Sequence, residues 1–209
     1  QSNDEETVVE SDLFALKFSN KGGYLSEVKL KNFVDFDSVP IYLIKDNNAA
    51  FNINFGTTDS RILNTKDLPF TPTVTKNGDV TVVSMKLKVS ESKFLEYRYE
   101  IKEGDYMMDF TIRSQGLSDV INSSQAVNLD WNLKAYRQEK SMYAENMYGY
   151  FYYKADDDVS YLSGNDEDEL KDVNWVAFKQ HFFTSILKTD TSFSSANVIS
   201  KDLVEDEEK

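Results

Sequence analysis

Short segments in which apolar and polar residues alternate recur along most of the chain. An apolar side chain at every second position predicts a strand with one buried face, because successive side chains of a strand point to opposite sides. The clearest segments are Val80–Val89, Phe94–Ile101, Met107–Ser114 and Val127–Leu133. The pattern therefore predicts a mainly β fold.

Turn signals separate these segments. "KNGD" at 76–79 contains Asn-Gly, which is a strong hairpin signal. "KEGD" at 102–105 and "NKGG" at 20–23 each supply a glycine that accepts a positive φ. Strands linked in this way predict an antiparallel sandwich with little helix. A weak helical pattern covers residues 135–146.

Composition narrows the class of protein. The chain has 209 residues, a formal net charge of -13 and no cysteine. Disulfides, zinc–thiolate sites and cysteine nucleophiles are excluded. A strongly acidic surface disfavours binding to nucleic acid and to anionic membrane surfaces. No signal peptide or membrane span is recognised, and residues 1–10 and the acidic tail 201–209 are expected to be loose.

The sequence contains no catalytic motif, so no catalytic, cofactor or metal residue is assigned. His181 is the only histidine, and it is interpreted as a packing residue rather than a general base or metal ligand. Gly22-Gly23 precedes a strand and not a helix, so it is interpreted as a turn rather than a phosphate loop. The acidic stretches 155–160 and 165–170 lack calcium-loop spacing and are interpreted as solvated loops.

The stretch "YGYFYYK" at 148–154 is the densest run of aromatic residues. In a strand, Tyr148, Tyr150 and Tyr152 would share one face. Packing in the core is the favoured interpretation, because large aromatic residues dominate protein cores. The alternative is that these three tyrosines face a ligand, such as a glycan or an extended peptide.

Four segments, taken in order, resemble one known family. "WVAFKQHFF" at 175–183 is similar to a signature of the large periplasmic domain of the YidC membrane protein insertases. Residues 11–33, with Gly22-Gly23, resemble the first hairpin of that domain. Residues 39–44 resemble its next strand, and residues 95–112 resemble a later hairpin. The details of the signature are similar to the versions found in the Bacteroidetes.

The resemblance implies a β-supersandwich like that of galactose mutarotases, covering residues 11–200. It implies a periplasmic location, attachment to the inner membrane by flanking helices, and a non-catalytic role in membrane protein insertion and folding. Inserting membrane proteins and Sec translocon components are the implied partners, with no cofactor. Further strands follow the signature in the family, so the sandwich is expected to be truncated on its C-terminal side.

Two other functions stay open at this point. One is a sugar-binding or sugar-active protein of the same fold, although mutarotase-type chemistry uses histidines and this chain has one. The other is a cleft that binds an extended peptide, which is expected to bind weakly or not at all.

The signature residues are expected to act in packing. They are Trp175, Val176, Ala177, Gln180, His181, Phe182 and Phe183, together with Gly22 and Gly23. A short helical turn is expected over residues 175–180, followed by a core strand to about Lys188. Trp175 and Phe182 are expected to be buried, so that truncating Trp175 would cost about 3–5 kcal/mol.

Overall fold

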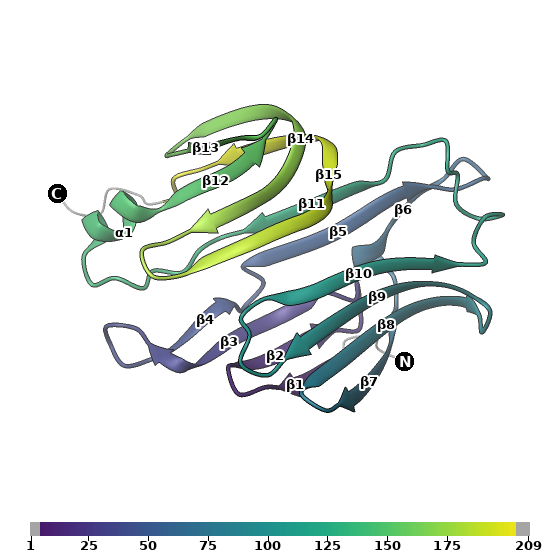
Figure 1. Ribbon diagram of the computed structural model, residues 1–209, viewed down its shortest axis with the longest axis horizontal. Coiled ribbons are helices and arrows are strands. Elements are labelled where there is room, and N and C mark those ends of the chain that lie inside the picture. The colour runs from purple at the N-terminus through teal and green to yellow at the C-terminus, as the bar shows by residue number, and fades with distance from the viewer. Residues whose placement is uncertain (1–4, 204–209) are drawn as a thin grey trace. The chain divides into compact units, whose positions relative to one another are not determined.

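A computed structural model describes residues 5–203, and the chain divides into two compact units. Unit 1 ends at Lys134 and unit 2 begins at Ala135. Each unit is built mainly of antiparallel strands, as the alternating pattern predicts (Figure 1). None of the helices in this range has the length and apolar character needed to cross a membrane.

The first sheet of unit 1 has the strand order β1-β2-β3-β4. Its strands are β1 (Glu6–Glu10), β2 (Phe14–Ser19), β3 (Leu25–Val34) and β4 (Pro40–Ile44). The NKGG turn joins β2 to β3, with φ of +89° at Gly22 and +69° at Gly23. β1 corrects the expectation that residues 1–10 are loose, because pairing with β2 orders residues 6–10. Residues 1–4 lie outside the described range.

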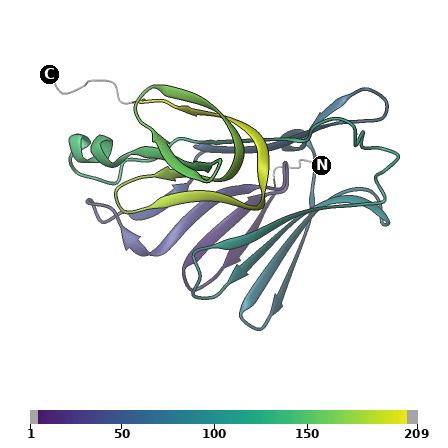
Figure 2. The same cartoon turned by 45° about the horizontal axis from the view of Figure 1, so that its top comes forward.

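The second sheet of unit 1 is a run of hairpins in the order β10-β9-β8-β7. Its strands are β7 (Thr71–Asn77), β8 (Val80–Ser90), β9 (Lys93–Lys102) and β10 (Met108–Gln115). The predicted turns at Asn-Gly and Glu-Gly are present, with φ of +64° at Gly78 and +77° at Gly104. These hairpins form the teal sheet seen in Figures 1 and 2.

A third, smaller sheet completes unit 1 in the order β11-β5-β6. Its strands are β5 (Ala49–Gly56), β6 (Ile62–Asn64) and β11 (Asn128–Leu133), with a 3-10 helix, η1 (Thr65–Asp67), after β6. Thr65 is fully buried, and its hydroxyl accepts a hydrogen bond of 2.8 Å from the backbone N–H of Ile53. This bond fixes the connection between β6 and the next sheet.

Aromatic side chains join the three sheets of unit 1. Phe18 of β2 packs on Tyr99 of β9 with ring centroids 4.8 Å apart. Phe51 of β5 contacts Tyr97 of β9 and Phe110 of β10 at 6.1 and 5.6 Å. Phe18 and Tyr97 are fully buried, so β9 forms the centre of this core. Burial raises the pKa of both tyrosines of β9 above the ordinary value.

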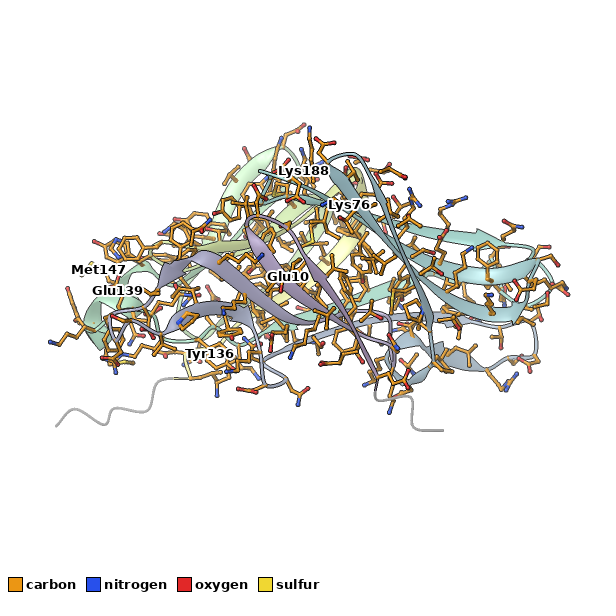
Figure 3. The ribbon with its side chains drawn as sticks, turned by 90° about the horizontal axis from the view of Figure 1, so that it is seen from below. Glu10, Lys76, Tyr136, Glu139, Met147 and Lys188 are labelled. Carbon is orange, nitrogen blue, oxygen red and sulfur yellow. The ribbon has the colours of Figure 1, made fainter. Side chains whose placement is uncertain are left out.

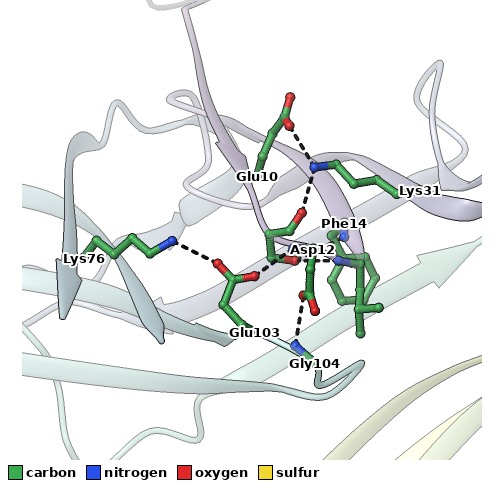
Figure 4. A network of polar contacts seen from close by, with 9 residues as sticks. Glu10, Asp12, Phe14, Lys31, Lys76, Glu103 and Gly104 are labelled. Atoms are coloured by element: carbon green, nitrogen blue, oxygen red, sulfur yellow. Dashed lines mark hydrogen bonds and ion pairs between the residues drawn. The ribbon is translucent and has the colours of Figure 1, made fainter. Parts of the chain in front are cut away.

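A polar network on the surface of unit 1 ties the first sheet to the second (Figure 4). The Asp12 backbone N–H donates to Glu103 Oε2 at 2.7 Å, and Lys76 Nζ donates to Glu103 Oε1 at 2.9 Å. The Gly104 N–H donates to Asp12 Oδ1 at 2.9 Å. The Lys76 and Asp12 donors lower the pKa of Glu103 from 4.5 to about 2.

Unit 2 is one four-stranded sheet with the order β13-β12-β14-β15, preceded by a short helix. The elements are α1 (Met142–Tyr148), β12 (Tyr150–Ala155), β13 (Asp158–Leu162), β14 (Asp166–Lys179) and β15 (Thr184–Ser200). Ser141 caps α1 by accepting a hydrogen bond of 3.3 Å from the Ala144 N–H. α1 overlaps the last five residues of the stretch 135–146, in which the sequence has a weak helical pattern.

The core of unit 2 gathers on one face of this sheet. Alternate residues of β12 are buried there together with residues of the other three strands of the sheet. The cluster consists of Phe151, Tyr153, Ala155, Leu162, Leu170, Val173 and Val198. Val176 and Phe178 of β14 pack against it. The Tyr153 hydroxyl donates to Asp168 Oδ2 at 2.8 Å.

Two local predictions for unit 2 are wrong. Residues 166–170 are not a loop but the start of β14, because each pairs with a residue of β15. Residues 175–179 are strand and not a helical turn, and the turn falls at residues 180–183. In the tail, residues 201–203 have no regular structure, and residues 204–209 lie outside the described range.

Candidate interaction surface

The signature stretch forms the end of the β14–β15 hairpin. Val176 and Phe178 face the core of unit 2, while Trp175 lies on the opposite face and is only half-buried. Phe182 is 67% exposed, because it lies in the turn that the Gln180 N–H closes by donating to the Phe183 carbonyl at 2.8 Å. The expectation that Trp175 and Phe182 are core residues is therefore wrong. Ala177 is buried.

Gln180 holds the segment before α1 against the hairpin. Its Nε2 donates to the Tyr136 carbonyl at 2.6 Å and to Glu145 Oε1 at 2.8 Å. The other oxygen of Glu145 accepts the backbone N–H groups of Gln138 and Glu139, both at 2.7 Å. One amide and one carboxylate thus organise residues 136–145. Figure 3 labels Glu139 and Met147 in this part of unit 2.

Three rings stack beside this hub. His181 stacks on Tyr148 with centroids 3.9 Å apart and an interplanar angle of 9°, and on Phe182 at 4.2 Å and 25°. His181 Nδ1 lies 2.5 Å from Glu139 Oε1. His181 is exposed in the turn, so it orders the surface of unit 2 and not its core. Tyr148 is the last residue of α1 and does not continue the face of Tyr150 and Tyr152.

Tyr150 and Tyr152 form a cluster with a third tyrosine that lies outside the aromatic run 148–154. Tyr161 of β13 lies directly opposite Tyr152 and is 53% exposed. The three ring centroids are 5.3 to 5.9 Å apart. The alternation of Val159 and Tyr161 in the sequence after the aromatic run is the signal that could have placed Tyr161 on the same face. These residues face away from the core, whereas Phe151 and Tyr153 face it.

Gly22 and Gly23 are far from this surface in sequence and serve the packing of unit 1. A Cβ added at Gly23 would lie 2.9 Å from the Phe70 ring. The Gly23 carbonyl accepts a hydrogen bond of 2.8 Å from the Tyr99 hydroxyl. The turn is thus the point where β2 and β3 meet β9.

The two acidic stretches differ in structure. Asp156 and Asp157 form the β12–β13 turn with φ of +49° and +67°, and Asp157 pairs with Lys154 at 3.2 Å. The second stretch lies in β14. Across residues 5–203, no group of three His, Cys, Asp or Glu side chains is placed to hold a metal ion.

Comparison with known proteins places the chain in one family. A family model described as the YidC periplasmic domain matches residues 6–204. The membrane protein insertase YidC of Porphyromonas gingivalis is 32% identical over 204 residues, which is 95% of this chain and 32% of that protein. That of Parabacteroides distasonis is 32% identical over 207 residues, 97% of this chain and 32% of that protein.

A third relative agrees with these two. The membrane protein insertase YidC of Bacteroides fragilis is 30% identical over 200 residues, which is 93% of this chain and 32% of that protein. The chain thus spans about a third of the length of the curated relatives it matches. Because the family model covers nearly all of the chain and the fold is mainly antiparallel β, the chain belongs to the YidC periplasmic domain family and lies in the periplasm of a Gram-negative bacterium.

Proposed function

We propose that this chain is a non-catalytic interaction module of a membrane protein insertase. It contacts inserting membrane proteins, or Sec translocon components, during insertion and folding. The observation that carries this proposal is the match of residues 6–204 to the YidC periplasmic domain, together with relatives whose name states membrane protein insertion. Binding and orientation of a partner require an exposed surface on a rigid frame, and unit 2 supplies one.

The end of unit 2 that carries α1 is the contact surface that we favour. Its exposed apolar side chains are Tyr143, Met147, Tyr148 and Phe182, with Tyr143 74% and Phe182 67% exposed. Exposed aromatic and methionine side chains are enriched where proteins meet partners. Stacking on His181 holds Tyr148 and Phe182 in place, and the hydrogen bond from Gln180 to Glu145 ties α1, which carries Tyr143 and Met147, to the hairpin.

Site-specific photo-crosslinking in the membrane-bound full-length insertase tests the proposal. A photoreactive residue at Tyr143 or Phe182 is expected to capture a nascent membrane protein or a translocon subunit. The matched control is Val74, an exposed residue of unit 1 that is 45% exposed. Equal capture from Val74 and from Phe182, or none from either residue of unit 2, would contradict the proposed surface.

The sugar-binding alternative rests on the half-buried Tyr150 and Tyr152 of β12 and the exposed Tyr161 of β13. Sugars stack on open aromatic faces, but Tyr150 meets Tyr152 and Tyr161 at interplanar angles of 62° and 82°, so the rings pack edge to face on each other. This geometry favours a self-packed cluster. A glycan array probed with the purified chain checks it, and saturable binding lost in Tyr161→Ala would favour the sugar-binding function.

A further inference from the structure

One face of the unit 2 sheet combines aromatic and basic side chains. Residues directly opposite each other on paired strands point to the same side, so the registers of the strands define this face. We name it the tyrosine–lysine face. It consists of Val159 and Tyr161 of β13, Tyr150, Tyr152 and Lys154 of β12, Trp175, Ala177 and Lys179 of β14, and Thr184, Ile186 and Lys188 of β15.

Three apolar side chains of this face are exposed to solvent, Tyr150, Tyr152 and Trp175 are half-buried, and Ala177 is buried beneath them. Tyr161, Val159 and Ile186 are 53%, 60% and 45% exposed. The three tyrosines touch one another near the start of β12 and the end of β13. Trp175 lies next to Lys154 and Lys188 in one row across the strands. Exposed rings in mutual contact form a continuous apolar surface and not a scatter of single side chains.

The charge of this face is opposite to that of the chain. The chain has 36 acidic and 23 basic residues, but the positions of the face include three lysines and no acidic residue. Lys154 forms an ion pair of 3.2 Å with Asp157 of the β12–β13 turn. Lys179 and Lys188 lie on two other strands, β14 and β15. Beyond the bulge near Asp172 the outer side of β14 becomes acidic at Glu167 and Glu169. Acidic residues therefore border the lysines of the face on this side.

We propose that the tyrosine–lysine face binds the anionic phospholipid headgroup layer of a membrane. Tyrosine and tryptophan favour the depth of the headgroups, where the ring lies in an apolar layer and the polar tip in water. Lysines attract anionic headgroups by about 1 kcal/mol each, and they bring the rings to that depth. The same headgroups repel Glu167 and Glu169 on the acidic part of β14, so the charges of this strand also help to orient unit 2.

A lipid layer fits this face better than an acidic peptide does. The lysines lie on three different strands with aromatic rings between them, so the cations are spread over an area. An extended peptide is recognised along a strand edge, through backbone hydrogen bonds and alternate side-chain pockets. The net charge of -13 disfavours membrane binding for the chain as a whole, but screening confines each charge to about 10 Å at 0.1 M salt, so the local charge of the face decides.

This proposal rests on the periplasmic placement of the family and not on the protein partners proposed above. Vesicle co-sedimentation of the 209-residue chain tests it, with vesicles of phosphatidylethanolamine and phosphatidylglycerol compared with phosphatidylcholine alone. Trp131→Phe leaves Trp175 as the sole tryptophan, because the chain has two. We expect binding to the anionic vesicles, a blue shift of Trp175 emission on binding, and weaker binding at high salt.

Two triple variants that remove the same number of positive charges distinguish binding through this face from a general effect of net charge. K154Q/K179Q/K188Q removes the lysines of the face, and we expect it to weaken vesicle binding on the order of 100-fold, since each lysine contributes about fivefold. K21Q/K66Q/K102Q removes three exposed lysines of unit 1 and is expected to change binding less than about threefold. Circular dichroism establishes that both variants are folded.

Three outcomes would overturn the proposal. They are equal binding to anionic and neutral vesicles, the same loss in both triple variants, and an unchanged Trp175 spectrum on saturated vesicles. Poly-glutamate is the probe for the competing partner. If the chain binds poly-glutamate through the same lysines and does not bind vesicles, the face recognises acidic peptides and the lipid proposal is wrong.

Discussion

Two phenylalanines of unit 2 show how position in a strand separates packing from exposure. Phe151 is buried in the core of unit 2, and Phe182 is 67% exposed in the hairpin turn. We expect Phe151→Ala to lower the free energy of unfolding by about 3–5 kcal/mol. Phe182→Ala is expected to change it by less than about 1 kcal/mol, because little of its surface leaves water on folding. Urea unfolding followed by fluorescence measures both, and equal losses would show that the turn is packed.

The Gly22-Gly23 turn allows a sharper test at a single residue. Gly23 has a φ of +69°, and an added Cβ would lie 2.9 Å from the Phe70 ring, whereas Gly78 has a φ of +64° with open space around it. Gly78→Ala should cost about 1 kcal/mol for the backbone alone. Gly23→Ala should cost about 1–3 kcal/mol more, because it adds a steric conflict inside a packed turn. Urea midpoints that match for the two variants would show that Phe70 moves aside freely.

At the scale of elements, Gln180 connects the hairpin of β14 and β15 to the segment before α1. Gln180→Ala removes two donors, and Glu145 then loses a partner while it still accepts the backbone of Gln138 and Glu139. We expect trypsin to cleave at Arg137 and Lys140 several-fold faster, because proteolysis follows local opening. The control, Gln115→Ala on an exposed part of β10, should leave the cleavage rate unchanged. An unchanged rate in Gln180→Ala would mean that the ring stack alone holds the segment.

The contact between the first two sheets of unit 1 predicts a dependence on pH. The folded-state pKa of Glu103 is about 2, against 4.5 ordinarily, because Lys76 and the Asp12 N–H bind the carboxylate. A lowered folded pKa stabilises the fold above pH 4.5, and this stabilisation is lost as the pH falls towards 2. We expect Glu103→Gln to be less stable than the parent chain at pH 7 and to lose less stability on acidification. Urea midpoints across this pH range measure it, and parallel curves for variant and parent would contradict the coupling.

The strands and hairpins of unit 1 could be predicted because their signals are local. Asn77-Gly78 and Gly104 set turns through the backbone of one or two residues, and alternation such as that of Tyr97 and Tyr99 follows from a single buried face. The start of β14 could not be predicted in this way. Residues 166–170 are acidic and look like a loop, but they are strand because β15 supplies hydrogen-bond partners from residues 196–200.

The position of the tyrosines of β12 and β13 in the sheet could be predicted only in part. The alternation of Tyr150 and Tyr152 identified one side of β12, but only the pairing of β12 with β13 adds Tyr161 to it. The signature stretch has apolar residues at nearly every position, so its sequence does not show which ones face the core. The register with β12 decides this, since Val176 lies opposite the buried Tyr153 and Trp175 lies opposite Lys154.

At the scale of the whole molecule, the net charge of -13 opposes the compact state through self-repulsion. Salt screens this repulsion, because the screening length falls from about 30 Å at 0.01 M to about 10 Å at 0.1 M. Salt also weakens surface ion pairs such as Lys31–Glu10, but exposed pairs contribute about 0–1 kcal/mol each. We therefore expect the melting temperature at pH 7 to rise with added sodium chloride, by about 2–4 °C for each kcal/mol gained.

The same salt series slightly above the isoelectric point of about 4.5 is the internal control for this expectation. There the net charge is small, so little repulsion remains to be screened and the rise in melting temperature should vanish or reverse. Sodium sulfate is avoided because it strengthens apolar burial independently of charge. If salt instead lowered the melting temperature at pH 7, surface ion pairs such as Lys31–Glu10 would stabilise the fold by more than the net charge destabilises it. That result would contradict the expectation that self-repulsion dominates.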